Sequence, residues 1–292
     1  MTITSPCTGI CKLDETTGWC LGCGRTGDEI AGWRGLPGED RDDVWTQIPE
    51  RLTQLGVACR RLPWSTEDIR AFVARTCAQP GGTWLMGVVG AVAEYVVPPA
   101  AVAKITHDGD AIVARTQNGA LRMTINDTVR ALTFDPPGLA SAPRVVLAVK
   151  REAGRLPVAP GLSELGEDDQ ALLPDSATRL FDLGLGRKEA RFCVRVGDEP
   201  AATALRRASG LALAQSLPVI GPPLMSEGPT RVVETALGRI EVQGPIPVDG
   251  ATMPNGPHTH LLPDQLAMQR AMPVGMDLPR VYLPGAIFYP AP

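Results

Sequence analysis

The spacing of apolar and polar residues changes along the chain from a helical period to a period of two. Over the first third, apolar side chains recur every three or four positions, as in amphipathic helices. This predicts helices over 26–33, 39–55 and 65–77. After residue 100 apolar and polar residues alternate, and Asp108-Gly109 and Asn118-Gly119 interrupt the alternation. Both dipeptides favour tight hairpin turns, so we expect an antiparallel meander over 101–125.

The rest of the chain combines further strands with short helices. We expect strands over 84–97 (one strand, with a bulge at Gly90), 129–134, 144–149 and 190–196, and a hairpin over 230–242. Helices are expected over 167–173, after Asp175, over 198–210 and over 264–271. Proline-rich connections are expected over 211–229 and in the tail after residue 271.

Four cysteines near the N-terminus form the most specific motif. Cys7, Cys11, Cys20 and Cys23 follow the spacing C-x3-C-x8-C-x2-C in a segment with little apolar sequence. A segment this short needs a covalent or metal crosslink to hold its shape. Two close cysteine pairs can place four thiolates around one centre, as in structural zinc and Fe–S sites. We therefore predict one four-cysteine metal centre that holds either zinc or an Fe–S cluster.

Disulfides, redox thiols and free structural cysteines are the alternatives to a metal centre. Four free thiols would find little core to bury them in such a polar, Gly-rich segment. Disulfides require an oxidising compartment, whereas Met1 is followed by neither a basic nor an apolar leader segment. A redox pair at Cys20 and Cys23 would normally open a helix within a βαβ unit, and no such pattern precedes it. Reduced thiolates and the missing leader lead us to expect a cytoplasmic protein.

The residues around the cysteines resemble a known family. The matching positions are Ser5-Pro6-Cys7, Cys11, Asp14, Thr17-Gly18, Cys20, Gly22 to Thr26, Glu29-Ile30, Trp33, Arg41 and Pro49. This pattern resembles the bacterial Cys-rich family called domain of unknown function 1289, over about residues 5–52. Members are labelled predicted Fe–S proteins, so the resemblance implies a cluster but no substrate or reaction. The remainder resembles only uncharacterised bacterial proteins.

His258 and His260 form a second, weaker candidate site. In an extended segment, residues i and i+2 point the same way, so both imidazoles could face one metal or anionic ligand. A third ligand would have to come from elsewhere, for example His107, Asp249 or Asp264. The alternative is a turn stiffened by the flanking prolines, in which both histidines are structural. We expect the structural role.

Composition narrows the functional classes. The chain has 292 residues, 44% hydrophobic and 21% charged, with a net charge of −4. A protein this acidic has no basic footprint for nucleic acid. The most apolar run, 84–97, contains Glu94 and is too short to span a membrane. The chain also lacks dinucleotide, P-loop, G-x-S-x-G and H-E-x-x-H motifs.

Together these observations predict an α+β protein in two parts. Residues 1–55 would form a small helical four-cysteine mini-domain, 56–64 a linker, and 65–292 a larger domain with a mainly antiparallel sheet. The expected function is a metal-binding accessory protein with a possible protein partner. An Fe–S redox or sensor protein is the alternative, and a metal-dependent enzyme using His258 and His260 is a weaker one. Nothing in the sequence indicates an oligomeric state.

Overall fold

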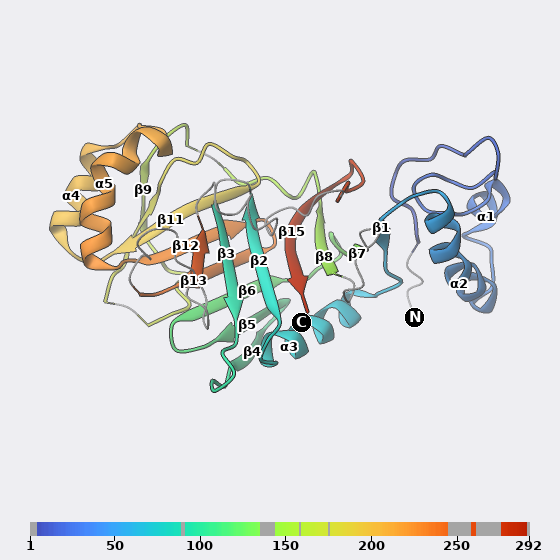
Figure 1. Ribbon diagram of the computed structural model, residues 1–292, viewed down its shortest axis with the longest axis horizontal. Coiled ribbons are helices and arrows are strands. Elements are labelled where there is room, and N and C mark those ends of the chain that lie inside the picture. The colour runs from blue at the N-terminus through green and yellow to red at the C-terminus, as the bar shows by residue number, and fades with distance from the viewer. Residues whose placement is uncertain are drawn as a thin grey trace.

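Two antiparallel β-sheets packed face to face form most of the molecule (Figure 1). The computed structural model describes residues 5–88, 91–134, 144–157, 159–174, 176–244, 258–260 and 276–290. Helices lie at both ends: α1 and α2 beyond one edge of the seven-stranded sheet, and α4 and α5 at the opposite end of the molecule. The predicted mainly antiparallel α+β class is therefore correct, although the strands divide into two sheets.

The seven-stranded sheet joins strands that are far apart in the sequence. In spatial order it consists of β1 (Cys59–Arg61), β7 (Val129–Phe134), β8 (Arg144–Lys150), β15 (Tyr282–Tyr289), β2 (Thr83–Val88), β3 (Ala91–Val96) and β14 (His258–His260). Every neighbouring pair is antiparallel. The segment 84–97 is thus a hairpin of two strands and not one bulged strand.

The eight-stranded sheet contains the predicted meander and the later hairpins. Its order is β4 (Lys104–Asp108), β5 (Ala111–Arg115), β6 (Gly119–Thr124), β13 (Gly238–Val242), β12 (Thr230–Thr235), β11 (Ala190–Val196), β10 (Arg179–Asp182) and β9 (Ser163–Glu167). The β12–β13 hairpin packs so closely on β6 that a Cβ atom on Gly238 would lie 1.9 Å from the Arg122 carbonyl oxygen. Only glycine fits there.

The main hydrophobic core lies between the two sheets. Trp84 and Tyr95 project from β2 and β3 toward Val194, Val233 and Ile240 of the other sheet, and all five are buried. Side chains alternate between the two faces of a strand, so every second residue of these central strands enters this core. The intervening residues of these strands point away from the main core, to the outer face of each sheet.

Four of the five described helices, α1 to α4, begin within about a residue of where the sequence pattern places them. The five are α1 (Gly27–Gly32), α2 (Gly38–Gln54), α3 (Thr66–Ala78), α4 (Glu199–Arg207) and α5 (Leu213–Glu227). Thr26 and Ser65 cap α1 and α3 in complete capping boxes with Glu29 and Asp68. None of the helices in the described parts of the chain is long and apolar enough to cross a membrane.

Several predicted elements differ from the structure. The segment 167–173 is no helix but the end of β9 and a loop, and β10 replaces the helix expected after Asp175. The predicted linker contains β1, and the predicted proline-rich tail contains β15. The helix predicted over 264–271 lies outside the described residues.

The predicted proline-rich connection over 211–229 is also wrong, because helix α5 occupies most of it. Three prolines lie inside the helix, namely Pro218, Pro222 and Pro223. Each removes one backbone hydrogen bond. Burial of Ile220 and Leu224 in the main core offsets this loss.

Candidate functional site

The cysteine segment is folded by its own backbone hydrogen bonds. The Asp14 carboxylate accepts hydrogen bonds from the backbone N–H groups of Thr16 and Thr17 and from the Thr17 hydroxyl, at 3.2, 2.8 and 2.8 Å. This turn reverses the chain between Leu13 and Cys20, which form an antiparallel bridge. Gly18 completes the turn at a φ of +68°. The turn therefore brings Cys11 back toward the second cysteine pair.

The four thiols lie as two neighbouring pairs, and none forms a disulfide. The Cys11 thiol donates a hydrogen bond to the Cys7 sulfur, and the Cys23 thiol donates one to the Cys20 sulfur. The pairs are linked, because the backbone N–H of Cys11 donates to the Cys20 sulfur. Cys20 and Cys23 are buried, whereas Cys11 is exposed.

Backbone N–H groups surround the sulfur atoms in a repeated pattern. Gly9 N donates to Cys7 Sγ at 3.4 Å, and Cys20 Sγ accepts from the N–H groups of Gly22 and Cys23. Cys23 Sγ accepts from the Arg25 backbone and, at 3.4 Å, from Arg25 Nε. Three of the four sulfurs thus accept a hydrogen bond from the residue two positions further on. These donors stabilise negative charge on sulfur.

The pKa values of the two buried thiols are shifted in opposite directions. The hydrogen bond from Cys23 is the main cause that lowers the pKa of Cys20, to about 5. The same hydrogen bond, together with burial, raises the pKa of Cys23. This hydrogen bond therefore favours the thiolate at Cys20 over the thiolate at Cys23.

The two cysteine pairs do not converge on one point as the four ligands of a metal ion would. Within the described ranges, no group of three or more His, Cys, Asp or Glu side chains is arranged so that it could hold a metal ion. Cys11 has a φ of +49°, and among the described residues it is the only one other than glycine in this left-handed region. That conformation costs about 1–2 kcal/mol. The residue that links the pairs is thus also a strained one.

Helix α2 supports the cysteine segment from one side. Trp33, Val44, Ile48 and Leu52 form a small core of their own. The guanidinium of Arg51 binds the Glu29 carboxylate at 2.7 Å and the Gly24 carbonyl oxygen at 3.2 Å. The predicted amphipathic character of this helix is therefore correct, and its apolar side packs with Trp33.

Two contacts attach the segment to the seven-stranded sheet. Arg61 on the edge strand β1 donates to the Cys7 carbonyl oxygen at 3.2 Å. Gly9 packs so tightly on Val281 that a Cβ atom there would lie 2.7 Å from Val281 Cγ1. Beside these contacts, the segment and the sheet edge enclose a cavity of about 660 Å³.

His258 and His260 lie on β14, at the edge of the seven-stranded sheet. The register places His258 opposite Glu94 and His260 opposite Val92. Glu94 is a buried carboxylate. Of the three proposed third ligands, His107 lies on β4 of the other sheet, and Asp249 and Asp264 are outside the described residues. The segment is therefore an edge strand, whereas a proline-stiffened turn was the expectation.

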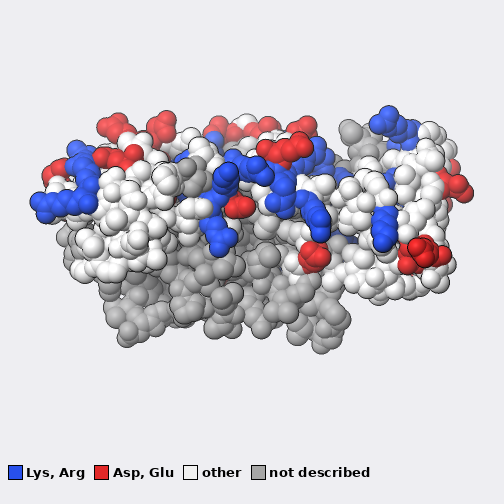
Figure 2. Space-filling model, turned by 90° about the horizontal axis from the view of Figure 1, so that it is seen from above, with Lys and Arg blue, Asp and Glu red and all other residues white. Residues whose placement is uncertain are grey.

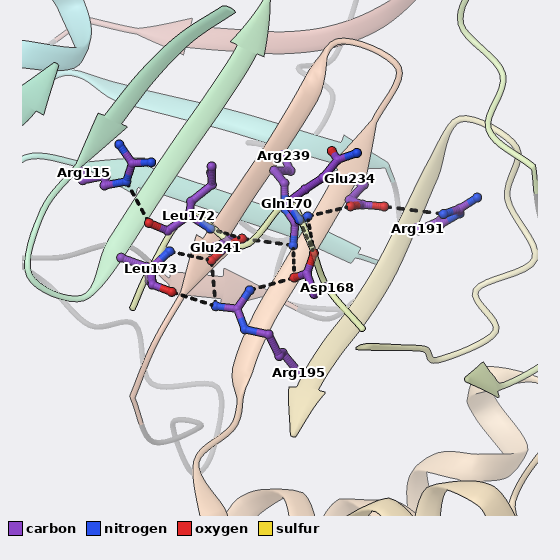
Figure 3. Close-up of polar contacts among 10 residues, drawn as sticks. All are labelled: Arg115, Asp168, Gln170, Leu172, Leu173, Arg191, Arg195, Glu234, Arg239 and Glu241. Atoms are coloured by element: carbon purple, nitrogen blue, oxygen red, sulfur yellow. Dashed lines mark hydrogen bonds and ion pairs between the residues drawn. The ribbon is translucent and has the colours of Figure 1, made fainter. Parts of the chain in front are cut away.

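A network of buried charges covers the outer face of the eight-stranded sheet (Figure 3). Asp168 accepts hydrogen bonds from Arg195 at 2.7 Å and from Arg239 at 2.7 and 3.0 Å. Glu241 accepts from Arg195 at 2.9 Å and from the backbone N–H groups of Leu172 and Leu173 at 2.9 and 3.0 Å. The loop after β9 is thereby fixed across the sheet.

Glu234 is the less tightly bound carboxylate of this network. Its nearest cationic groups are Arg239 at 3.3 Å and Arg191 at 3.6 Å, and it borders an open pocket of about 390 Å³. Burial raises the pKa of Glu234, and the two arginines only partly offset it. Burial would also raise the pKa of Asp168, but the hydrogen bonds and charges of Arg239 and Arg195 hold it below its usual value.

No pattern in the sequence predicted this network of buried charges. Alternation along β11 and β13 places Arg195 and Glu241 on the face opposite the main core, which a sequence pattern assigns to solvent. The one sign of the network in the sequence was the high number of charged residues at the outward-facing positions of these strands.

On the face shown in Figure 2, Lys and Arg side chains lie beside Asp and Glu and do not form one continuous basic surface.

Comparison with known families covers nearly the whole chain. No curated protein and no solved structure matches it significantly. The model of the protein of unknown function DUF1289 matches residues 5–52, as the cysteine pattern predicted. The model of the family of unknown function DUF6925 matches residues 68–292, well over half of the chain. The chain therefore belongs to the family DUF6925 and carries a DUF1289 region before it.

Proposed function

We propose that residues 5–55 form a metal-binding mini-domain in which Cys7, Cys11, Cys20 and Cys23 hold a single metal ion. The observation that carries this proposal is the set of backbone N–H groups directed at the Cys7, Cys20 and Cys23 sulfurs. Such donors favour thiolates, and thiolate is the form of cysteine that binds metal. The donor set fits the group, because four thiolates suit zinc or iron.

The close approach within each pair argues against an Fe₄S₄ cluster. Around tetrahedral zinc, with Zn–S bonds of about 2.3 Å, neighbouring sulfurs are roughly 3.8 Å apart. In an Fe₄S₄ cluster each thiolate binds a different iron, so the sulfurs lie roughly 6–7 Å apart. Thiols close enough to hydrogen-bond, as in both pairs here, match the shorter separation. Zinc and an Fe₂S₂ cluster, in which two thiolates share each iron, both match it, and zinc is the ion that we propose.

Metal binding would require the two pairs to converge. The exposed Cys11 is the ligand that can move at least cost, because few packed neighbours restrain it. Its strained backbone gives a further reason to expect movement. In this view the metal fixes a segment that has little core of its own, and the protein acts as an accessory factor in the cytoplasm.

Metal analysis of anaerobically purified protein tests this proposal. We expect about one zinc per chain and no visible absorption, and cobalt replacement should give the spectrum of tetrahedral thiolate coordination. Cys20→Ser should abolish stoichiometric binding. Cys77→Ala is the matched control, since Cys77 is buried in the main core away from the segment. Brown protein with iron and sulfide would establish the Fe–S alternative, and metal-free protein would refute both.

A second metal site at β14 is a weaker candidate. The observation that favours it is the register of His258 against the buried carboxylate Glu94, since histidine and carboxylate together are zinc ligands. A metal-dependent enzyme would need this site. Combined His258→Ala and His260→Ala substitution should leave metal content unchanged if only the cysteines bind metal. Loss of a second equivalent would establish the histidine site.

A further inference from the structure

The cavity between the cysteine segment and the sheet edge has the features of a ligand site. One wall comes from the segment itself, including Thr8, Ile10 and Lys12. The facing wall comes from the chain before β1 and from residues 277–281 before β15. Its volume of about 660 Å³ lies within the range of small-molecule pockets, which often form where two parts of a protein meet.

The charges in this cavity are mainly positive. Lys12 projects from the segment and Arg280 from the facing wall, and Asp277 is the one acidic residue among the lining residues. Among the described residues, neither the Lys12 ammonium nor the Arg280 guanidinium forms an ion pair with a carboxylate. With two cations and one carboxylate in its lining, the cavity carries a net positive charge, which favours an anionic ligand.

The remaining lining is largely apolar and partly accessible. Ile10 is 45% exposed and Val281 40% exposed, and both border the cavity. Leu21, Val57 and Leu278 extend the apolar surface. Because exposed apolar surface beside a cavity gains free energy when a ligand covers it, the occupant should have an apolar part.

A buried hydroxyl group in the same wall lacks a partner. Thr8 lines the cavity and is buried, and its Oγ1 has no hydrogen bond within the described structure. A buried hydroxyl without a partner destabilises the fold. A polar group that enters the cavity, or a water that it orders, would satisfy this hydroxyl.

We propose that this cavity binds a small amphipathic anion, with a carboxylate or phosphate head group between Lys12 and Arg280 and an apolar body against Ile10 and Val281. The proposal rests on the proposed metal centre, because the metal would hold the wall formed by the segment in place. The metal would then have a role beyond folding, since it would make ligand binding depend on metal occupancy.

Calorimetric titration of the full-length, metal-loaded protein tests the proposal. The probes are octanoate, octyl phosphate, inorganic phosphate and octylamine. Octanoate or octyl phosphate should bind, and the tighter of the two identifies the head group. Inorganic phosphate should bind at least tenfold more weakly because it lacks an apolar body, and octylamine should not bind. Failure of both amphipathic anions to bind at millimolar concentration would overturn the proposal.

Charge reversal provides the specific control. Arg280→Glu, which is distant in sequence from all four cysteines, should lower the affinity at least tenfold without changing metal content or melting. Arg187→Glu is the matched control, because Arg187 is exposed and lies outside the cavity. Unchanged affinity in Arg280→Glu would refute the site even if the metal is present.

Removal of the metal separates the two proposals. If the protein contains no metal, the metal centre is wrong, and titration of the protein as purified still tests the cavity. If it contains metal, chelation should abolish binding of the anion. Equal affinity with and without metal would show that the wall does not depend on it.

Discussion

Arg195 and Glu241 form an ion pair at 2.9 Å in which neither side chain is exposed to solvent, although the strand β12 separates β11 from β13. Removing either partner leaves the other buried charge with one counter-ion fewer, although Glu241 still contacts Arg239 at 3.0 Å and Arg195 still contacts Asp168 at 2.7 Å. We expect Arg195→Met and Glu241→Met each to lower the free energy of unfolding by about 3–5 kcal/mol. Urea denaturation measures the change. The double variant should lose less than the sum, since it leaves neither charge of the pair behind.

Arg231 on β12 should behave in the opposite way from Arg195. Both side chains are buried, but all three Arg231 nitrogens lack hydrogen-bond partners within the described structure. Burial alone lowers the pKa of Arg231, to about 10. Arg231→Met should therefore raise the melting temperature, with a gain of about 1 kcal/mol or more. Arg195→Met is the matched control. A loss of similar size in both variants would mean that Arg231 has a counter-ion.

Asp168 and Glu234 should make opposite contributions to the pH dependence of stability. The folded-state pKa of Asp168 is lowered, so its contribution is complete above its unfolded pKa of about 3.9 and is lost as the pH falls further. Asp168→Asn should remove that contribution and destabilise the protein at pH 7 by about 3–5 kcal/mol. Urea denaturation over a pH series measures both effects.

Because the pKa of Glu234 is raised, its contribution to stability depends on pH in the opposite direction from that of Asp168. Its neutral form is favoured in the folded state, so its contribution to stability is lost as the pH rises through the folded-state pKa. Glu234→Gln should therefore not destabilise the protein at pH 7, and it should flatten the pH profile above pH 4, near the unfolded pKa of about 4.3. Strong destabilisation of Glu234→Gln would show that the two long ion pairs outweigh burial.

The contact between Arg61 and the Cys7 carbonyl should couple the cysteine segment to the sheet. Arg61→Met removes this 3.2 Å hydrogen bond but leaves all four thiols in place. We expect metal content to stay the same while amide hydrogen exchange in residues 7–12 becomes faster. Arg60→Met, on the same strand but directed at the Pro49 carbonyl oxygen, is the control. Unchanged exchange in the Arg61 variant would argue against this coupling.

Local sequence signals were reliable where they depend on short-range chemistry. The helix starts near Thr26 and Ser65 and the turn at Asp108-Gly109 each depend on residues within four positions, and each was predicted correctly. The helix α5 was missed because proline and glycine normally end helices, whereas the burial of Ile220 and Leu224 depends on the tertiary structure.

The candidate sites show the same contrast between local signals, which the sequence contains, and contacts that depend on the tertiary structure. Cysteine spacing indicated which residues gather near the N-terminus, but side-chain convergence depends on the fold and on the ion. The charge network was missed because the loop that buries Arg195 and Glu241 follows β9, more than twenty positions before Arg195. The cavity at Lys12 and Arg280 joins residues that no local pattern relates.

The position of β15 has a consequence for synthesis of the chain. This strand follows every other strand of its sheet in the sequence, yet it lies between β8 and β2. Until it emerges from the ribosome, β1–β7–β8 and β2–β3 expose two edges that face the same vacant position. Each edge could pair with another nascent chain. Insertion of β15 covers both edges in one step, so the seven-stranded sheet stays open to mispairing until residues 282–289 have been synthesised.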